Sequence, residues 1–293
     1  MNHIVLDLEW NQPRVPALAV TDPFFLKGEI FQIGAVKLDE SFSATDTFNG
    51  LIKPVYYRKM HSKVKQLTGV SSEKLSRGDG FGETVRRFLD WCGDCDFFTW
   101  GPDDVPMLRD NLIIHKIPAT LPAYYDLQLI FDHQITRQHR QFSLAVAAES
   151  VGETLTDAHD ALSDATATAL LCRHLDMKAG LRDYPALYGQ ITPPSVFNKP
   201  VDGKFRSKRE LISKCCTKTL DHPVTGKLEL EGWRFGGLWK LFASGTDRKG
   251  AEYFVSVKMA KKDDGFTASL SAHPMNKKLR ETFDGAFRPV IVS

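Results

Sequence analysis

Residues 3–10 read HIVLDLEW, an apolar run interrupted by two acidic residues, Asp7 and Glu9. Short apolar runs of this kind are typical of strands buried in the middle of a sheet. Side chains at i and i+2 of a strand point to the same face, so Asp7 and Glu9 share one face while Leu6 and Leu8 share the other. Because unpaired buried carboxylates are costly, the pair predicts a polar site on that face. A partly exposed strand end would also explain it.

Outward from this run, strand-like and helical patterns follow one another through the first two-thirds of the chain. Further strand-like runs occupy residues 30–40, 47–54, 96–100 and 123–125, and helical patterns occupy residues 81–92, 105–115, 144–152 and 160–176. Three early strands with hairpin-length links, then strand–helix alternation, predict an α/β fold with a mixed five-stranded sheet and helices on both faces. Residues 11–27 contain three prolines and predict a loop beside the end of the first strand.

The sequence changes character from about Thr192. We expect an α/β domain over residues 1–190, a basic linker over residues 191–209, and a small β-rich domain over residues 210–293. The β-rich assignment rests on strand-like runs and one short helical run, at residues 227–235, 238–245, 252–260, 266–273 and 277–283. The aromatic residues expected in the core of this domain are Trp233, Phe235, Trp239 and Phe254.

The overall net charge of +2 conceals an asymmetry along the chain. Residues 1–197 carry 19 Lys and Arg against 25 Asp and Glu, a net charge of −6, whereas residues 198–293 carry 19 against 11, a net charge of +8. Bound cations would neutralise an acidic half, and a basic half suits a polyanionic partner. A chance drift in the number of surface lysines would produce the same asymmetry.

Composition places the chain among soluble globular proteins, with 42% hydrophobic and 25% charged residues. No apolar stretch approaches the ~18 residues of a membrane span, and the N-terminal run lacks a basic leader, so we expect neither a membrane partner nor a signal peptide. Five cysteines, an odd number, favour the reducing cytoplasm.

Further residues able to carry chemistry follow the later strands. Asp104 comes after the strand of residues 96–100, at a Gly-Pro turn, and α/β sheets carry function at the carboxyl ends of their strands. Either Asp103 or Asp104 could instead cap the next helix. His159 and Asp164 are five residues apart, a rotation of roughly 140° on a helix. They converge only if His159 lies in the loop before the helix that carries Asp164.

Together these motifs resemble the DEDDh branch of the DnaQ-like, ribonuclease T-type 3′→5′ exonucleases. The matching residues are Asp7 and Glu9, then Trp100, Gly101, Asp104 and Leu108, then His159, Ala161, Asp164 and Ala165. The resemblance covers residues 3–172 and implies a ribonuclease-H-like form of the predicted sheet. The opening VLDLEWNQP and the TWG turn look closest to bacterial Eri-type exoribonuclease-like enzymes, including the sporulation-inhibitor type.

The resemblance also implies roles for these residues. Asp7, Glu9, Asp104 and Asp164 would hold two divalent metal ions, for which carboxylate ligands favour Mg²⁺ or Mn²⁺. Asp7 would bridge the two ions, and Asp104 would act mainly through metal-bound water. His159 would be the general base, a role that suits a side chain titrating near neutral pH.

The expected partner is the 3′ end of single-stranded RNA or DNA, with RNA favoured. Trp10 could stack on the terminal base or be a core aromatic, and Leu8 and Trp100 are further candidates for substrate contact. Phe24 and Phe25, in the proline-rich loop, could form a lid or anchor that loop. Alternatives for the whole chain are an oligoribonuclease-like enzyme for very short substrates and a nucleic-acid-binding adaptor with a vestigial site.

The cysteines offer two motifs that resemble metal or redox sites. Cys92 and Cys95 have the Cys-x-x-Cys spacing, but no second pair lies at zinc-site distance, so structural cysteines are expected. Cys215 and Cys216, with His222, resemble a zinc-ribbon pattern, but adjacent cysteines replace a spaced pair. A structural zinc ion is therefore not expected.

Overall fold

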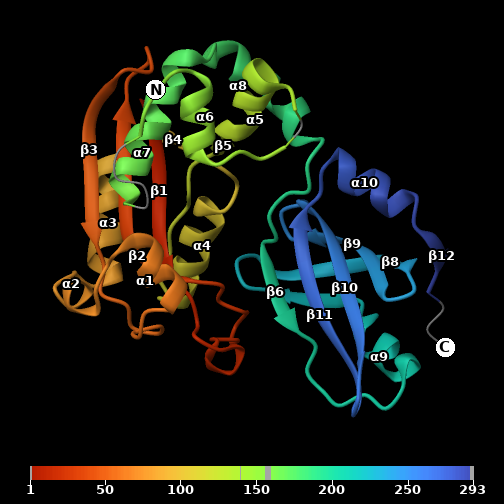
Figure 1. Cartoon of the computed structure of the whole chain (residues 1–293). Helices are drawn as coiled ribbons and strands as arrows, with labels where there is room; N and C mark the ends of the chain where they lie inside the picture. The colour runs from red at the N-terminus through yellow and green to blue at the C-terminus, as the bar shows by residue number, and fades with distance from the viewer. Residues whose placement is uncertain (1, 139, 156–159, 291–293) are drawn as a thin grey trace. The chain divides into compact units, whose positions relative to one another are not determined.

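The computed structural model describes residues 2–138, 140–155 and 160–290. The chain forms two compact units, drawn in Figure 1. The first comprises the chain up to Ala19 together with Leu26–Leu187, and the second comprises Val20–Phe25 and the chain from Tyr188 onward. None of the helices formed by the described residues is both long and apolar enough to cross a lipid bilayer.

The first unit is built on a five-stranded sheet with the order β3-β2-β1-β4-β5. Its strands are β1 (Asn2–Asn11), β2 (Glu29–Leu38), β3 (Ala44–Leu51), β4 (Cys95–Thr99) and β5 (Tyr124–Asp126). β2 runs antiparallel to both of its neighbours, whereas β1, β4 and β5 run parallel to one another. The predicted mixed sheet is confirmed, and the strand with the acidic pair lies at its centre.

Helices cover both faces of this sheet (Figure 1). The α-helices of this unit are α1 (Ser62–Thr68), α2 (Ser72–Ser76), α3 (Phe81–Cys92), α4 (Asp104–Ile114), α5 (Leu127–Phe131), α6 (Leu144–Ser150), α7 (Ala161–Leu171) and α8 (Met177–Tyr188). Polar side chains cap several of them. The hydroxyl of Ser143, for example, accepts from the amide of Val146 at the start of α6.

The apolar face of β1 packs into the main core. Leu6 and Leu8 belong to one buried cluster with Phe81, Val85 and Phe88 of α3. The apolar residues of α3 recur at helical spacing and therefore face the sheet together. Burying each of these side chains contributes about 1.5–3 kcal/mol, which fixes the orientation of β1 and turns its acidic residues to the opposite face.

On that opposite face, α7 approaches the backbone of β2 very closely. Gly34 lies directly across from Asp7 in the β1–β2 register. A Cβ atom at Gly34 would lie 2.1 Å from the carbonyl carbon of Ala161 and 2.2 Å from the amide nitrogen of Leu162. A side chain at position 34 would therefore collide with the first turn of α7, and glycine allows that turn to lie against the sheet beside Asp7.

The second unit contains a seven-stranded antiparallel sheet with the order β12-β8-β9-β10-β11-β6, with β7 paired to β8. Its elements are β6 (Phe197–Pro200), α9 (Lys208–Cys215), β7 (Thr219–His222), β8 (Gly226–Gly237), β9 (Lys240–Asp247), β10 (Glu252–Lys262), β11 (Gly265–Pro274), α10 (Lys277–Asp284) and β12 (Phe287–Pro289). The predicted β-rich character of the C-terminal region is confirmed.

Two expectations for this region are corrected. Part of the stretch 191–209, predicted as a linker, is built into the sheet, because β6 pairs with β11 and Phe197 is buried. The predicted aromatic core is also only partly right. Phe254 is buried and packs with Leu279 and Phe283 of α10, but Trp239 is exposed, and aliphatic residues of β8–β11 fill most of the interior.

Candidate metal centre and active site

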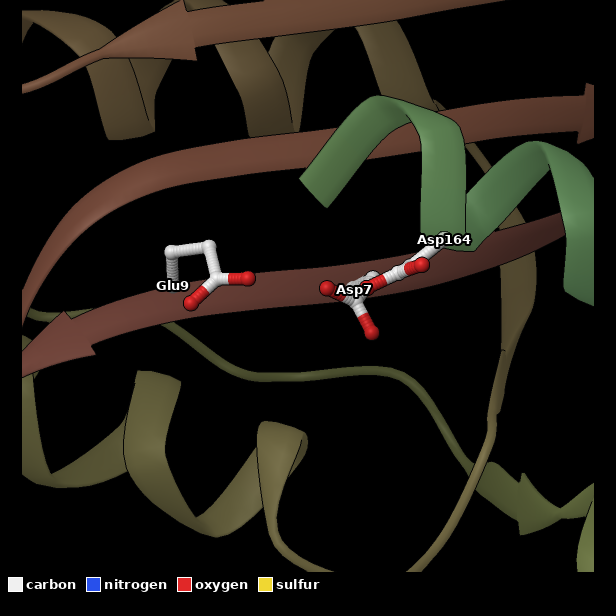
Figure 2. Close-up of side chains that lie close together, drawn as sticks. All are labelled: Asp7, Glu9 and Asp164. Atoms are coloured by element: carbon white, nitrogen blue, oxygen red, sulfur yellow. The ribbon is translucent and has the colours of Figure 1, made fainter. Parts of the chain in front are cut away.

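Three of the predicted metal ligands come together on the polar face of β1. Asp7 and Glu9 project from this strand, and Asp164 reaches them from the first turn of α7 (Figure 2). One carboxylate oxygen from each residue lies within 4.8 Å of the others. Asp164 therefore lies on a helix, as predicted, whereas His159, predicted to lie in the loop before it, is outside the described residues.

Asp104 lies next to this group without belonging to it. It is the first residue of α4 and only 6% exposed, and its Oδ1 accepts a hydrogen bond of 3.0 Å from the amide of Leu8. Asp103, the alternative considered from the sequence, is exposed, and its side chain makes no capping hydrogen bond. Of the two neighbours, Asp104 is therefore the one whose carboxylate is fixed beside β1.

Burial, together with repulsion from neighbouring carboxylates, raises the pKa values of Asp7, Glu9 and Asp104. Burial, followed by repulsion from Asp104, Asp164 and Glu9, holds the pKa of Asp7 well above its usual value. Burial and the same kind of repulsion raise the pKa of Glu9 to about 8. Burial raises the pKa of Asp104 to about 8, although the amide hydrogen bond from Leu8 opposes the shift. The group therefore resists full ionisation in the absence of a compensating cation.

These properties fit a divalent metal site. A cation would offset both the burial and the mutual repulsion that raise these pKa values. The donors are all carboxylate oxygens, which suit Mg²⁺ or Mn²⁺ better than zinc. Asp7, Glu9 and Asp164 are close enough together to share an ion, and Asp104 is near enough to influence their charge.

Residues that the motifs did not single out hold the start of α7. Asp160 is the N-cap of this helix and accepts from the amide of Ser163. Its second carboxylate oxygen accepts a hydrogen bond of 2.9 Å from Nε2 of Gln32 on β2, which also donates to Asn49 on β3. An acidic residue just before a helix is a recognisable N-cap signal, but its partner Gln32 is 128 residues away and carries no local signal.

A second polar network holds the turn before α4. The carboxylate of Asp126, at the end of β5, accepts from the amide of Gly101 at 3.0 Å and from that of Gln128 at 2.9 Å. Burial raises the pKa of Asp126 to about 7. The indole of Trp100 donates to the carbonyl of Phe142. These bonds fix the Trp-Gly turn, so Asp126 positions Asp104 without lining the metal site.

A cavity of about 400 Å³ opens at the carboxylates. All three candidates for substrate contact, Leu8, Trp10 and Trp100, line it. Trp10 also packs against the main core, so the two roles considered for this residue are compatible. Residues from α1, from α5 and from neighbouring loops complete the wall: Gln12, Val64, Leu67, Thr68, Gln128 and Gln141. Five acidic residues also line it, namely Asp7, Glu9, Asp103, Asp104 and Asp164, so the cavity is strongly acidic.

Other sequence features have structural explanations. Phe24 is buried, and the amide of Phe25 donates to the carbonyl of Asn198 within the second unit, which favours an anchor over a lid. Cys92 and Cys95 are both buried and reduced at the junction of α3 and β4.

The second cysteine pair and its histidine lie in the second unit. Cys215 is buried at the end of α9, and Cys216 is half-buried. Both are reduced, and burial raises the pKa of their thiols, to about 11 and about 12 respectively. Nδ1 of His222 accepts from the amides of Val224 and Thr225 and so organises the turn between β7 and β8.

Comparison with known proteins identifies a family for the first part of the chain. The Exonuclease family model, RNase_T, matches residues 4–172, the part of the chain that carries the carboxylates. No curated protein sequence matches the chain.

Three solved structures share the fold of this part. The nuclease domain of 3′hExo, described as a DEDDh family member bound to rAMP, is 19% identical with a TM-score of 0.52, covering 59% of this chain and 90% of that one. A 3′-exonuclease in 3′-end specific recognition of a histone mRNA stem-loop is 16% identical with a TM-score of 0.51, covering 59% and 80%. A full-length 3′-exonuclease is 16% identical with a TM-score of 0.53, covering 61% of each chain.

These likenesses show that the mixed sheet has the expected ribonuclease-H-like fold. The finer resemblance to Eri-type enzymes stays a prediction. Because the family model covers more than half of the sequence, the chain belongs to the exonuclease family, and the resemblance to its DEDDh members that the acidic motifs predicted is confirmed.

Proposed function

We propose that this protein is a metal-dependent 3′→5′ exonuclease that hydrolyses single-stranded nucleic acid, RNA in preference to DNA, to 5′-mononucleotides. The observation that carries the proposal is the convergence of Asp7, Glu9 and Asp164 within 4.8 Å at a cavity, in a chain of the exonuclease family. Without cations these carboxylates repel one another, so their convergence favours a metal-dependent reaction over a purely structural role.

Asp7, Glu9 and Asp164 would hold the metal, with Asp104 beside them. Two divalent ions, when bound, supply an activated water and stabilise charge on the leaving 3′ oxygen. The protein contributes a fixed carboxylate frame: β1 sets the spacing of Asp7 and Glu9, and α7 sets the position of Asp164. Such positioning is a large part of catalysis, because a misplacement of about 1 Å can cost roughly 10²-fold in rate.

His159 is proposed as the general base that takes the proton of the attacking water. It directly precedes Asp160, whose carboxylate is fixed by Gln32 and by the first turn of α7. A histidine is suited to the task because its pKa lies near neutral pH. Trp10, Leu8 and Trp100 are proposed to contact the terminal nucleotide in the cavity that they line.

The preference for RNA rests on the resemblance and on the fold likeness to proteins described with rAMP and with a histone mRNA stem-loop. Discrimination depends on contacts to the 2′-hydroxyl, and so the experiment compares the two sugars directly.

The test uses the full chain with 5′-labelled single strands of RNA and DNA of equal sequence. We expect shortening from the 3′ end in Mg²⁺ or Mn²⁺, faster for RNA, no cleavage in chelator, and resistance of a strand with a blocked 3′ end. Full activity in chelator would contradict the metal-dependent mechanism. Cleavage of a circular single strand would contradict exonucleolytic action.

A further inference from the structure

The turn between β8 and β9 exposes two large apolar side chains at one end of the second sheet. Leu238 is 71% exposed and Trp239 is 36% exposed. The sequence predicted that Trp239 lies in the core of this domain. Instead, its indole is accessible, and aliphatic residues fill most of the interior.

Trp239 forms an aromatic pair bordered by cations. Its ring stacks against that of Phe266 on β11, with centroids 6.3 Å apart and an interplanar angle of 27°. The ammonium group of Lys208 on α9 lies 4.7 Å from the centre of the indole, and this lysine also donates to the carbonyl of Leu238. Lys261 on β10 lies directly across from Phe266 in the β10–β11 register and is exposed.

A pair of lysines occupies the other face of the same sheet end. Lys240 follows Trp239 and lies directly across from Lys258 in the β9–β10 register. Like charges in this position destabilise a sheet. Both lysines are exposed, and neither forms an ion pair within the described parts of the chain.

The row that contains the lysine pair holds no acidic residue. Across the sheet it consists of Gly237, Lys240, Lys258, Ser269 and Pro200. The nearest acids along β10, Asp263 and Asp264, lie beyond it in the turn to β11. The repulsion between the two lysines is thus uncompensated within the row, and a bound polyanion would relieve it.

We propose that this sheet end is a second binding site for single-stranded nucleic acid, separate from the carboxylate cavity. We define it as the Trp239 patch: Lys208, Trp239, Lys240, Lys258, Lys261 and Phe266. Bases would stack on the exposed side of Trp239 on one face, where Lys208 and Lys261 lie beside them. A strand that passes round the end of the sheet would bring its following phosphates to Lys240 and Lys258 on the other face. Aromatic stacking combined with cations along the backbone is the combination used by proteins that bind single strands without sequence preference. The net charge of +8 over residues 198–293 matches this occupant. The choice of nucleic acid as the ligand rests on the proposed exonuclease function.

The test measures binding separately from hydrolysis. The full chain is titrated, in chelator, against a fluorescent single-stranded RNA of about 30 nucleotides at several salt concentrations. We expect Lys240→Glu/Lys258→Glu to weaken binding at least roughly tenfold and to reduce the slope of log affinity against log salt by about 1.4, because two phosphate contacts are lost. Trp239→Ala should weaken binding roughly 5- to 150-fold, and Trp239→Tyr should recover most of it, because stacking is retained.

Arg248→Glu/Lys249→Glu is the matched control. It makes the same change of charge at the opposite end of β9, in the turn that leads to β10. We expect it to keep the wild-type salt slope. Equal losses of affinity in the two double variants would show that only net charge matters, and would overturn the Trp239 patch. Wild-type affinity in both Lys240→Glu/Lys258→Glu and Trp239→Ala would also overturn it.

Cleavage of a trinucleotide in Mg²⁺ separates this inference from the proposed function. All of these variants should cleave it at the wild-type rate, because none alters the carboxylate cavity. A wild-type protein that cleaves no substrate but binds the long strand through the Trp239 patch would contradict the proposed function alone. A protein that cleaves normally while its patch variants bind like the wild type would contradict the patch alone.

Discussion

The side-chain amide of Gln32 on β2 donates a hydrogen bond of 2.9 Å to the carboxylate of Asp160, the N-cap of α7. Gln32 lies across from Glu9 in the β1–β2 register, so one residue touches the strand that carries Glu9 and the helix that carries Asp164. Gln32 thereby links β1 and α7, the two elements that supply the proposed metal ligands, through the β1–β2 pairing and the hydrogen bond to Asp160. It is a positioning residue, because it acts through Asp160 rather than on the substrate.

Replacing Gln32 should loosen this connection. We expect Gln32→Met, which keeps the volume but removes the amide, to lower kcat roughly 10- to 100-fold with little change in KM, and to raise the Mg²⁺ concentration needed for half-maximal activity. A hydrogen bond to a charged group contributes about 1.5–3 kcal/mol. Asn49→Ala is the control, since it removes only the other acceptor of the Gln32 amide. Identical metal dependence in Gln32→Met and wild type would exclude the positioning role.

The smallest possible side chain at position 34 should disturb the site. Gly34→Ala places a methyl group against the backbone of Ala161, so α7 must shift, at a cost of about 1–3 kcal/mol in stability. Since Asp164 moves with α7, activity should fall roughly 10²-fold. Thermal unfolding and a Mg²⁺ titration measure the two effects. Gly80→Ala, where a Cβ meets nothing within 4 Å, should leave the Mg²⁺ titration unchanged and lower stability only through the weaker N-cap of α3.

Removal of one carboxylate should have opposite effects on activity and on metal-free stability. Asp7→Asn deletes a ligand, and we expect activity to fall at least roughly 10³-fold, because the metal contributes several kcal/mol to catalysis. Without metal, the same change removes a group that repels Glu9, Asp104 and Asp164. The variant should therefore unfold at a higher temperature than the wild type in chelator at pH 8, and calorimetry checks this. A lower unfolding temperature would show that repulsion does not dominate.

The stability of the metal-free protein should fall as pH rises. Glu9 and Asp104 have pKa values of about 8 in the folded chain, against ordinary values of 4.5 and 3.8. Between these limits the folded state holds protons that the unfolded state has released, so the free energy of unfolding decreases with pH from about pH 4 to pH 8. Urea unfolding across this range measures the slope. Added Mg²⁺ should restore most stability at the alkaline end, and a flat profile in chelator would contradict the raised pKa values.

Loss of the proposed base should slow the reaction without abolishing metal binding. A general base contributes ~10²–10⁴-fold, so His159→Ala should lose that much of kcat. In the wild type, activity should rise with pH through the histidine range, and this limb should change in the variant. Unaltered Mg²⁺ dependence of the residual activity distinguishes loss of the base from loss of the site. A wild-type rate in His159→Ala would place the base elsewhere.

Local patterns predicted the elements that depend on local chemistry. The helix expected over residues 81–92 has those bounds as α3, because its apolar side chains recur at helical spacing and all face the sheet. Asp7 and Glu9 were predicted to share a face because strand geometry alone requires it. In both cases the relevant neighbours lie within a few residues along the chain.

Features that depend on distant partners were missed. β6 contains few residues and ends at Pro200, and only its pairing with β11 makes it a strand. α8 has no counterpart among the predicted elements, and it contains Pro185, which ordinarily interrupts a helix. The exposure of Trp239 was also not foreseen, because hydrophobicity indicates a preference for burial but not whether the fold offers a partner.

The order in which β1 and α7 occur along the chain has a consequence for synthesis on the ribosome. Asp7 lies on the first strand, whereas Asp164 lies on a helix that follows four further strands. At about 5–20 residues per second, Asp164 is delivered roughly 8–30 s after Asp7. A nascent chain therefore carries an incomplete carboxylate set until α7 has emerged and docked against Gly34. Chains that terminate prematurely before α7 never acquire Asp164 and never complete the set. The order of the elements thus delays assembly of the complete set, while the chain is still beside its own messenger RNA.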